Sequence, residues 1–163
     1  VIGTGRIGKG VVQRAAGFNM NILANDAYPD RAFLERFGGQ YVDLDRIYRE
    51  ADFITIHAPL TDTTKNMINE RALSMMKPTA VLINAARGGI VDEAALYTAL
   101  KEHWIYGAAL DATEIEPACG SPLALLDNCI LTPHAGAATM GLLAAQNVID
   151  VLQGKKCQYI VNE

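Results

Sequence analysis

The chain alternates short apolar runs with longer amphipathic stretches from end to end. The apolar runs predict strands at residues 1–2, 21–25, 40–43, 53–57, 80–85, 105–111 and 129–134. The amphipathic stretches predict helices at residues 8–16, 31–38, 43–51, 69–76, 92–103 and 139–154. Strands that are apolar on both faces and alternate with helices are typical of a parallel sheet covered on each side. The pattern therefore predicts an α/β fold with a doubly wound, Rossmann-type parallel sheet of six or seven strands.

Polar residues and glycines indicate where some of these helices begin and end. Gly38 or Gly39 closes the second helix, since glycine readily adopts the left-handed conformation that follows a helix. Asp43 or Asp45 lies near the start of the third helix, and Asp92 caps the fifth.

Ligands of doubly wound folds bind beyond the carboxyl ends of the strands. The residues that follow predicted strands are therefore the candidates for function: 3–8, Asp26, 57–59, 85–87, Asp111 and 133–134. His103 and Trp104 lie instead at a helix end, where a packing role is the simpler interpretation.

The opening stretch GTGRIG fits the pattern G-x-G-x-x-G. Gly3 permits the tight turn, Gly5 lets a pyrophosphate approach the backbone, and Gly8 lets the helix pack closely on the strand. The helix that follows presents free N–H groups to the phosphates. Taken alone, the pattern also describes an ordinary turn.

Asp26 strengthens the nucleotide interpretation, because it follows the next predicted strand. An acid at this point accepts hydrogen bonds from the ribose hydroxyls of NAD, and its charge repels the 2′-phosphate of NADP. The alternative is an acid that only caps a helix or a turn. Arg31 is the one nearby cation that would favour NADP.

Three further residues supply what reduction of a 2-keto acid requires beyond the cofactor. The guanidinium of Arg87 suits bidentate binding of a carboxylate, although it could instead pair with Asp92 or Glu93. His134 is the natural proton donor near neutral pH, although a lone histidine is more often structural. Glu116 or Glu114 would orient the imidazole and favour its charged form. Asp111, at a strand end, would accept a hydrogen bond from the nicotinamide or would anchor its loop.

Composition and charge narrow the class of protein. The 163 residues favour one domain; half are apolar and a fifth are charged, as in ordinary globular proteins. The net charge of -4 and the absence of a basic run argue against nucleic acid as a partner. No apolar stretch reaches the ~20 residues of a membrane span. Three cysteines without a CxxC pattern indicate a reduced, cytoplasmic protein with neither disulfides nor a metal site.

The stretches GTGRIG, HAPLT, NAARGGIVDEAAL, GAALD, EP and LTPHAGAAT occur in this order, and together they resemble the D-isomer-specific 2-hydroxyacid dehydrogenases. The resemblance implies NAD as the cofactor, Arg87 as the carboxylate-binding residue, His134 as the acid/base and Glu116, rather than Glu114, as its partner. It also implies a cofactor site built from Gly3, Gly5, Arg6, Ile7 and Gly8 at the pyrophosphate, Asp26 at the ribose, Ala58, Pro59 and Thr64 on the adenosine side, and Ala85, Ala86 and Asp111 at the nicotinamide. Thr113 and Ala138 depart from residues common in that family.

The same resemblance implies a domain organisation and an oligomeric state. We expect residues 1–163 to be the NAD-binding domain and the substrate domain of the family to be missing from this chain, whose first strand is cut to Val1 and Ile2. Such a chain would bind NAD but turn over poorly, because nothing closes over the substrate. A homodimer is expected, with the stretch after the first helix and the stretch PLTDTTKNMIN as candidate interfaces.

Two other functions remain open at this stage. An NAD-sensing corepressor related to the dehydrogenases would retain Arg87, Glu116 and His134. A Rossmann domain without chemistry would have them by coincidence. For an enzyme, the residues predict hydride transfer between NAD(H) and a small D-2-hydroxy or 2-keto acid, with the individual substrate left open.

Overall fold

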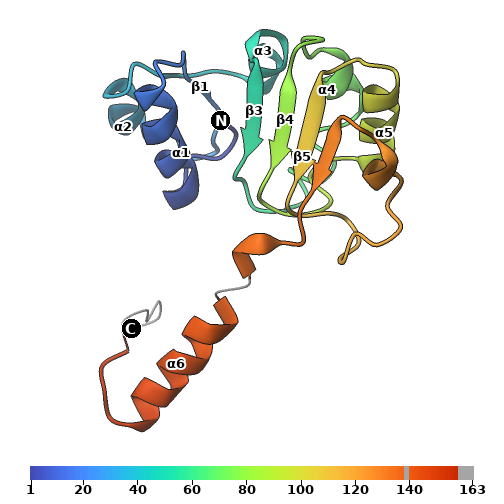
Figure 1. Ribbon diagram of the computed structural model, residues 1–163. Coiled ribbons are helices and arrows are strands. Elements are labelled where there is room, and N and C mark those ends of the chain that lie inside the picture. The colour runs from blue at the N-terminus through green and yellow to red at the C-terminus, as the bar shows by residue number, and fades with distance from the viewer. Residues whose placement is uncertain (138–139, 158–163) are drawn as a thin grey trace. The chain divides into compact units, whose positions relative to one another are not determined.

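The computed structural model describes residues 1–137 and 140–157. It comprises two compact units, Val1–Pro133 and His134–Glu163. The first unit alternates helices and strands in the order α1 (Arg6–Gly17), β1 (Leu23–Ala24), α2 (Arg31–Glu35), β2 (Gln40–Tyr41), α3 (Leu44–Glu50), β3 (Phe53–Ile56), α4 (Glu70–Ser74), β4 (Val81–Asn84), α5 (Glu93–Lys101), β5 (Gly107–Leu110), the 3₁₀ helix η1 (Pro122–Leu125) and β6 (Cys129–Leu131) (Figure 1).

All of the strand pairs in the first unit are parallel. β1 pairs with β2, and β3, β4, β5 and β6 pair in that order. Ile2 joins the two sets, because it forms parallel bridges to Asn25 and to Ile56. The backbone N–H of Gly3 donates to the carbonyl of Asn25 at 2.8 Å, and that of His57 donates to the carbonyl of Ile2 at 2.7 Å. The doubly wound parallel sheet is confirmed, with Ile2 between β1 and β3.

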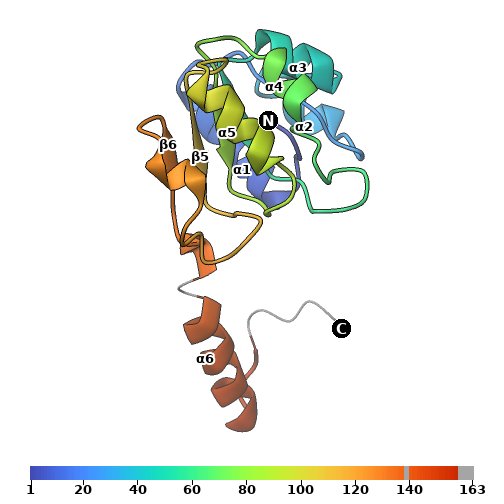
Figure 2. The same cartoon turned by 90° about the vertical axis from the view of Figure 1, so that its right-hand side faces the viewer.

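The main core lies between the four-stranded sheet and one layer of helices. α3, α4 and α5 lie on the same face of this sheet (Figures 1 and 2). Ile54, Ile56 and Leu82 point from the strands into this core, where they meet Leu73 and Leu96 from the helices, and all five are fully buried. Each such side chain contributes roughly 1.5–3 kcal/mol on burial. The amphipathic helices predicted from the sequence therefore cover the sheet as expected.

A second, smaller core forms where α1 and α2 pack beside β1. Val12, Ile22, Ala24, Phe33 and Leu34 are its buried members. These residues pack the middle of α1 and the helix α2 against β1 and the residue before it. They therefore set the positions of the glycine turn and of Asp26, which follow Ile2 and β1 respectively.

The helix ends agree with local hydrogen bonding. Asp43, rather than Asp45, caps α3, since its Oδ1 accepts from the N–H of Arg46 at 2.7 Å. Asp92 caps α5 by accepting from the N–H of Ala95 at 3.0 Å. Gly38, after α2, has a left-handed φ of 68°. The sequence pattern did not predict η1, because four residues are too few to show a helical period. Ser121 caps this short helix, and a proline is its first residue.

The second unit contains the 3₁₀ helix η2 (Ala135–Ala137) and α6 (Met140–Leu152). The helix predicted at residues 139–154 is present as α6, which ends two residues earlier than predicted. Thr139, at the predicted start of that helix, and Ala138, one of the two departures from the family pattern, lie outside the described residues. Gly154 follows α6 with a φ of 72°.

Candidate functional site

The glycine turn connects Ile2 to α1, and two of its glycines are required by the packing of the chain itself. Gly3 has a φ of 87°, and a Cβ there would lie 2.6 Å from the backbone carbon of His57. A Cβ on Gly8 would lie 2.0 Å from the carbonyl oxygen of Gly3. Both distances are far below van der Waals contact, so the turn can approach the end of β3 and the start of α1 this closely only with glycine at these positions.

Gly5 differs from the other two glycines, because a Cβ there would meet no atom within 4 Å. Gly5 is the N-cap of α1, and no side chain caps this helix end. The first turn of α1 also carries no acid, and its Ile7 side chain is 70% exposed. The open space therefore faces a helix N-terminus with unsatisfied N–H groups and positive dipole, which suits a phosphate.

Asp26 lies beside this turn and is held by its hydrogen bonds. Its Oδ2 accepts from both the N–H and the hydroxyl of Thr4, the latter at 3.0 Å, and its Oδ1 accepts from the N–H of Tyr28 at 2.8 Å. Partial burial raises the pKa of Asp26, but the hydrogen bonds from Thr4 and Tyr28 and the charge of Lys9 outweigh it, and the pKa is lowered. An ionised, oriented carboxylate therefore lies next to the helix N-terminus.

The loop after β3 also borders the glycine turn. A Cβ on Gly3 would lie 2.7 Å from the backbone nitrogen of Ala58, so this loop and the turn are in direct contact. The hydroxyl of Thr64 donates to the carbonyl of Pro59 at 2.6 Å and accepts from the N–H of Thr61 at 2.8 Å. The Thr64 side chain thus closes the loop that presents Ala58 and Pro59, the residues predicted for the adenosine side.

Asn84 connects the loop of Arg87 to the loop that leads to Glu116. Asn84 is almost fully buried at the end of β4. Its Nδ2 donates to the carbonyl of Arg87 at 2.9 Å and to that of Ala112 at 3.4 Å, while its Oδ1 accepts from the N–H of Ala86 at 3.1 Å. One side chain therefore fixes both loops at the carboxyl end of the sheet.

Gly88 brings the same two loops into contact. A Cβ on Gly88 would lie 1.9 Å from the carbonyl oxygen of Thr113, which excludes any side chain at this position. The Arg87 side chain is exposed, and its guanidinium donates to the carbonyl of Ala86 at 2.7 Å. The exposed Glu116 accepts from the N–H of Thr113 at 3.3 Å.

Glu114, the alternative to Glu116, and Asp92 and Glu93, the alternative partners of Arg87, form other hydrogen bonds in the structure. Glu93 accepts from the N–H of Glu114 at 2.6 Å, and the N–H of Glu93 lies 3.5 Å from the Glu114 carboxylate. Partial burial and the nearby charge of Glu114 raise the pKa of Glu93. Asp92 caps α5. Glu114 and Glu93 therefore connect the loop after β5 to the start of α5. This engagement of Glu114 favours Glu116 as the predicted partner of His134.

Asp111 and His134 follow β5 and β6. The carboxylate of Asp111 accepts from the hydroxyl of Thr132, and its N–H donates to the carbonyl of Asn84 at 2.9 Å. His134 is the first residue of the second unit and has a φ of 54°, a left-handed value that is uncommon outside glycine. Such residues concentrate at functional sites. The pairing of His134 with Glu116 remains a prediction.

Residues 1–136 match the protein family described as D-isomer specific 2-hydroxyacid dehydrogenase, NAD binding domain. The chain belongs to this dehydrogenase family. Its cofactor is therefore NAD, and the open space at Gly5 beside an ionised Asp26 fits the pyrophosphate and ribose of that dinucleotide.

Relatives of this chain carry the names of several enzymes. The chain is 45% identical to the D-3-phosphoglycerate dehydrogenase of Methanocaldococcus jannaschii over 99% of its own length and 32% of that protein. It is 44% identical to the glyoxylate reductase of Pyrococcus furiosus, covering 100% of itself and 50% of the relative. Among solved structures, D-lactate dehydrogenase with NAD+ from Lactobacillus jensenii matches with a TM-score of 0.81 and 33% identity, over 99% of this chain and 54% of that one. The chain thus spans about half the length of the glyoxylate reductases that it matches, and less of the phosphoglycerate dehydrogenase.

Thr4 lies within the candidate stretch 3–8 but was given no role from the sequence, and Asn84 and Tyr41 were not predicted as site residues. Thr4 and Asn84 each lie next to predicted site residues at strand ends, so their position at the carboxyl edge was a usable signal. Tyr41, whose hydroxyl lies 2.8 Å from that of Thr4, gave no such signal. Its contact exists because β2 lies beside β1, which no local pattern specifies.

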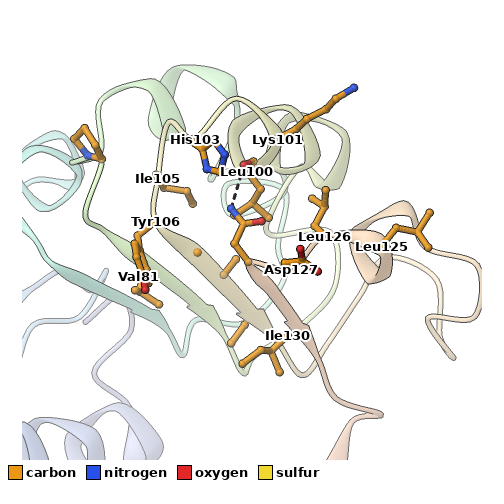
Figure 3. Close-up of a pocket in the computed structure, with 15 residues that line it drawn as sticks. Val81, Leu100, Lys101, His103, Ile105, Tyr106, Leu125, Leu126, Asp127 and Ile130 are labelled. Carbon is orange, nitrogen blue, oxygen red and sulfur yellow. Dashed lines mark hydrogen bonds between the residues drawn. The ribbon is translucent and has the colours of Figure 1, made fainter.

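A pocket of about 890 Å³ lies away from these residues, at the amino ends of the strands (Figure 3). It is lined mainly by apolar side chains from β5, β6, α5 and η1, with Lys101, His103 and Asp127 at its rim (Figure 3). Trp104 packs against the main core, which agrees with the predicted packing role, whereas His103 is exposed and does not share that role. Among the described residues, no group of acids, histidines and cysteines is arranged to hold a metal ion. No helix in the described part of the chain is long and apolar enough to cross a membrane.

Proposed function

We propose that this chain is the NAD-binding and catalytic half of a dehydrogenase that interconverts a small D-2-hydroxy acid and its 2-keto acid. The observation that carries the proposal is the contact between the Arg87 loop and the loop of Glu116 at the same sheet edge as the glycine turn and Asp26. The chain spans about half the length of relatives named as glyoxylate reductase. The activity is therefore proposed for the whole protein that contains these residues, and not for these residues alone.

The catalytic role that we propose for each residue follows from the chemistry of its side chain. NADH, when bound, supplies the hydride. Arg87 holds the substrate carboxylate through its planar guanidinium, which is exposed at the site. His134 gives a proton to the keto oxygen during reduction and takes it back during oxidation. Glu116 is its partner, and an adjacent carboxylate favours the charged imidazolium that donates this proton.

The cofactor-binding residues are proposed by position. Gly5 leaves the space for the pyrophosphate, which the N–H groups of Arg6 and Ile7 border, while Asp26 accepts from the adenosine ribose. Gly3 and Gly8 shape the turn. The remaining proposed contacts are Ala58, Pro59 and Thr64 on the adenosine side, and Ala85, Ala86 and Asp111 at the nicotinamide.

The test is NADH-dependent reduction of glyoxylate, pyruvate and larger 2-keto acids by the complete gene product. His134→Gln should lower kcat by about 100-fold or more, because general acid catalysis typically contributes that much. Arg87→Ala should raise KM for the keto acid while leaving NADH affinity unchanged. His103→Gln is the matched control, since His103 is exposed at the opposite end of the strands. Full activity of the His134→Gln variant would contradict the proposed mechanism.

We also propose a cytoplasmic homodimer. Phe18 and Met20, just after α1, are 77% and 45% exposed, and Leu60, in the loop after β3, is 46% exposed. These apolar side chains belong to the two stretches expected at the interface. Their burial in a dimer would remove them from water.

A further inference from the structure

The hydroxyl of Tyr41 connects two parts of the site that are distant in the sequence. Tyr41 lies on β2, and its hydroxyl oxygen is 2.8 Å from the Thr4 hydroxyl oxygen in the glycine turn. It is also 3.1 Å from the backbone nitrogen of Asp30, the N-cap of α2. No function proposed above uses this tyrosine.

Counting protons gives the direction of each hydrogen bond. Thr4 has one hydroxyl proton, which it donates to the Oδ2 of Asp26 at 3.0 Å. The Tyr41 hydroxyl must therefore donate to the oxygen of Thr4, and it accepts from the N–H of Asp30. The result is a relay from Asp30 through Tyr41 and Thr4 to Asp26. Each donor in such a chain is polarised by the next, which strengthens the last bond, to the carboxylate.

The relay fixes which part of Asp26 is available to a ligand. A carboxylate has about four acceptor positions. Oδ2 of Asp26 uses two of them for Thr4, whereas within the described part of the chain Oδ1 accepts one hydrogen bond, from Tyr28. The open position therefore lies on Oδ1, and the bonds on Oδ2 hold the carboxylate in the orientation that presents it.

The same network restrains the lysine closest to these acids. The Nζ of Lys9 forms an ion pair with Oδ2 of Asp30, whose Oδ1 caps α2 through the N–H of Phe33 at 3.1 Å. Lys9 also lies 4.9 Å above the centre of the Phe33 ring. The ion pair with Asp30 thus neutralises Lys9, whose charge would otherwise attract a phosphate. The backbone N–H of Asp30 also donates the first hydrogen bond of the relay to Asp26.

We propose that Tyr41 is a positioning residue that sets the preference of this site for NADH over NADPH, by holding Thr4 and through it Asp26. The proposal rests on the proposed function, since it assumes that Asp26 meets the adenosine ribose. With Asp26 fixed, a ribose hydroxyl gains a charge-assisted hydrogen bond, whereas a 2′-phosphate meets a negative charge that cannot turn away. Without the Tyr41 hydroxyl, the Thr4 hydroxyl loses the donor that orients it, and Asp26 is held firmly only by the backbone N–H groups of Thr4 and Tyr28.

The experiment compares Tyr41→Phe with Tyr28→Phe in calorimetric titrations of the protein. Tyr41→Phe should raise the Kd for NADH about five-fold, the loss expected for one neutral hydrogen bond, and should lower the ratio of NADPH to NADH Kd values. Tyr28→Phe is the matched control, because Tyr28 contributes only its backbone N–H and its side chain is 89% exposed. Reduced nicotinamide mononucleotide, which lacks the adenosine half, should bind equally to all three proteins.

A double-mutant cycle with Asp26→Asn shows whether Tyr41 acts through Asp26. We expect Tyr41→Phe to change NADH affinity little once Asp26 is asparagine. Additive losses, or equal NADH affinity of Tyr41→Phe and the control, would overturn the proposal while leaving the function intact. Absence of NADH binding to the folded wild-type protein would overturn both. Should Tyr41→Phe fail to melt cooperatively, Thr4→Val breaks the relay at its other member and decides the outcome by the same criteria.

Discussion

At the scale of single residues, the three glycines of the turn have different physical reasons to be glycine. Gly3 and Gly8 are required by backbone atoms of this chain, which would lie 2.6 and 2.0 Å from a Cβ at these positions, whereas Gly5 faces open space. A sequence motif cannot separate these cases, because it records the residue and not its surroundings. The structure shows a packing requirement at Gly3 and Gly8 and none at Gly5, where we propose that a phosphate lies.

This difference predicts opposite behaviour of two alanine variants. Gly8→Ala should lower the free energy of unfolding by about 1–3 kcal/mol, because the methyl group overlaps the carbonyl of Gly3. Gly5→Ala should leave stability within about 0.5 kcal/mol but weaken NADH binding at least ten-fold, since the methyl group occupies the phosphate space. Urea unfolding and NADH titration measure the two effects. Loss of stability in Gly5→Ala with NADH affinity retained would contradict the assignment.

At the scale of elements, the periodic pattern was sufficient for the fold because each strand and helix buries one recognisable face. The predicted strands and helices occur among the described residues, most of them shorter at their ends, and the first strand is represented by the bridges of Ile2. What the pattern could not supply are contacts between elements. Asn84 bonds to two loops, and Tyr41 reaches the glycine turn, only because the strands lie in this order. The residues alone likewise left Glu114 and Glu116 equivalent, whereas the structure engages Glu114 with Glu93.

The pairing of Glu93 with Glu114 predicts a pH dependence of stability. Burial, then the Glu114 charge, raises the pKa of Glu93 above its ordinary value of 4.5, although the hydrogen bond from Glu114 opposes the shift. The folded protein therefore binds this proton at a higher pH than the unfolded chain does. Wild type should gain stability relative to Glu93→Gln as the pH falls from 7 toward 4.5.

Urea unfolding at about pH 7 and again near pH 4.5, the ordinary pKa of the Glu93 side chain, checks this prediction, with Glu102→Gln as the control. Glu102 is exposed at the other end of α5 and takes no part in the pair. The Glu93→Gln difference should change with pH more than the Glu102→Gln difference does. The same change in both variants, or a relative loss of wild-type stability at the lower pH, would show that the pair with Glu114 does not govern this end of α5.

At the scale of the whole molecule, the first unit carries the residues that we propose for the cofactor site. The glycine turn, Asp26, the loop after β3 and the two loops joined by Asn84 all lie at the carboxyl ends of parallel strands. This edge is where doubly wound folds bind nucleotides. Membership of the dehydrogenase family and the match to a D-lactate dehydrogenase with NAD+ agree with this assignment. The large pocket at the opposite ends of the strands has no part in it.

The most direct test is calorimetric titration of this chain with NADH, with NADPH and the Asp26→Ala variant measured in parallel. We expect that NADH binds, that NADPH binds at least ten-fold more weakly, and that Asp26→Ala loses most of the NADH affinity while melting like wild type. A cooperatively folded chain that binds no NADH, or whose affinity is unchanged in Asp26→Ala, would contradict the assignment of the glycine turn and Asp26 to the dinucleotide.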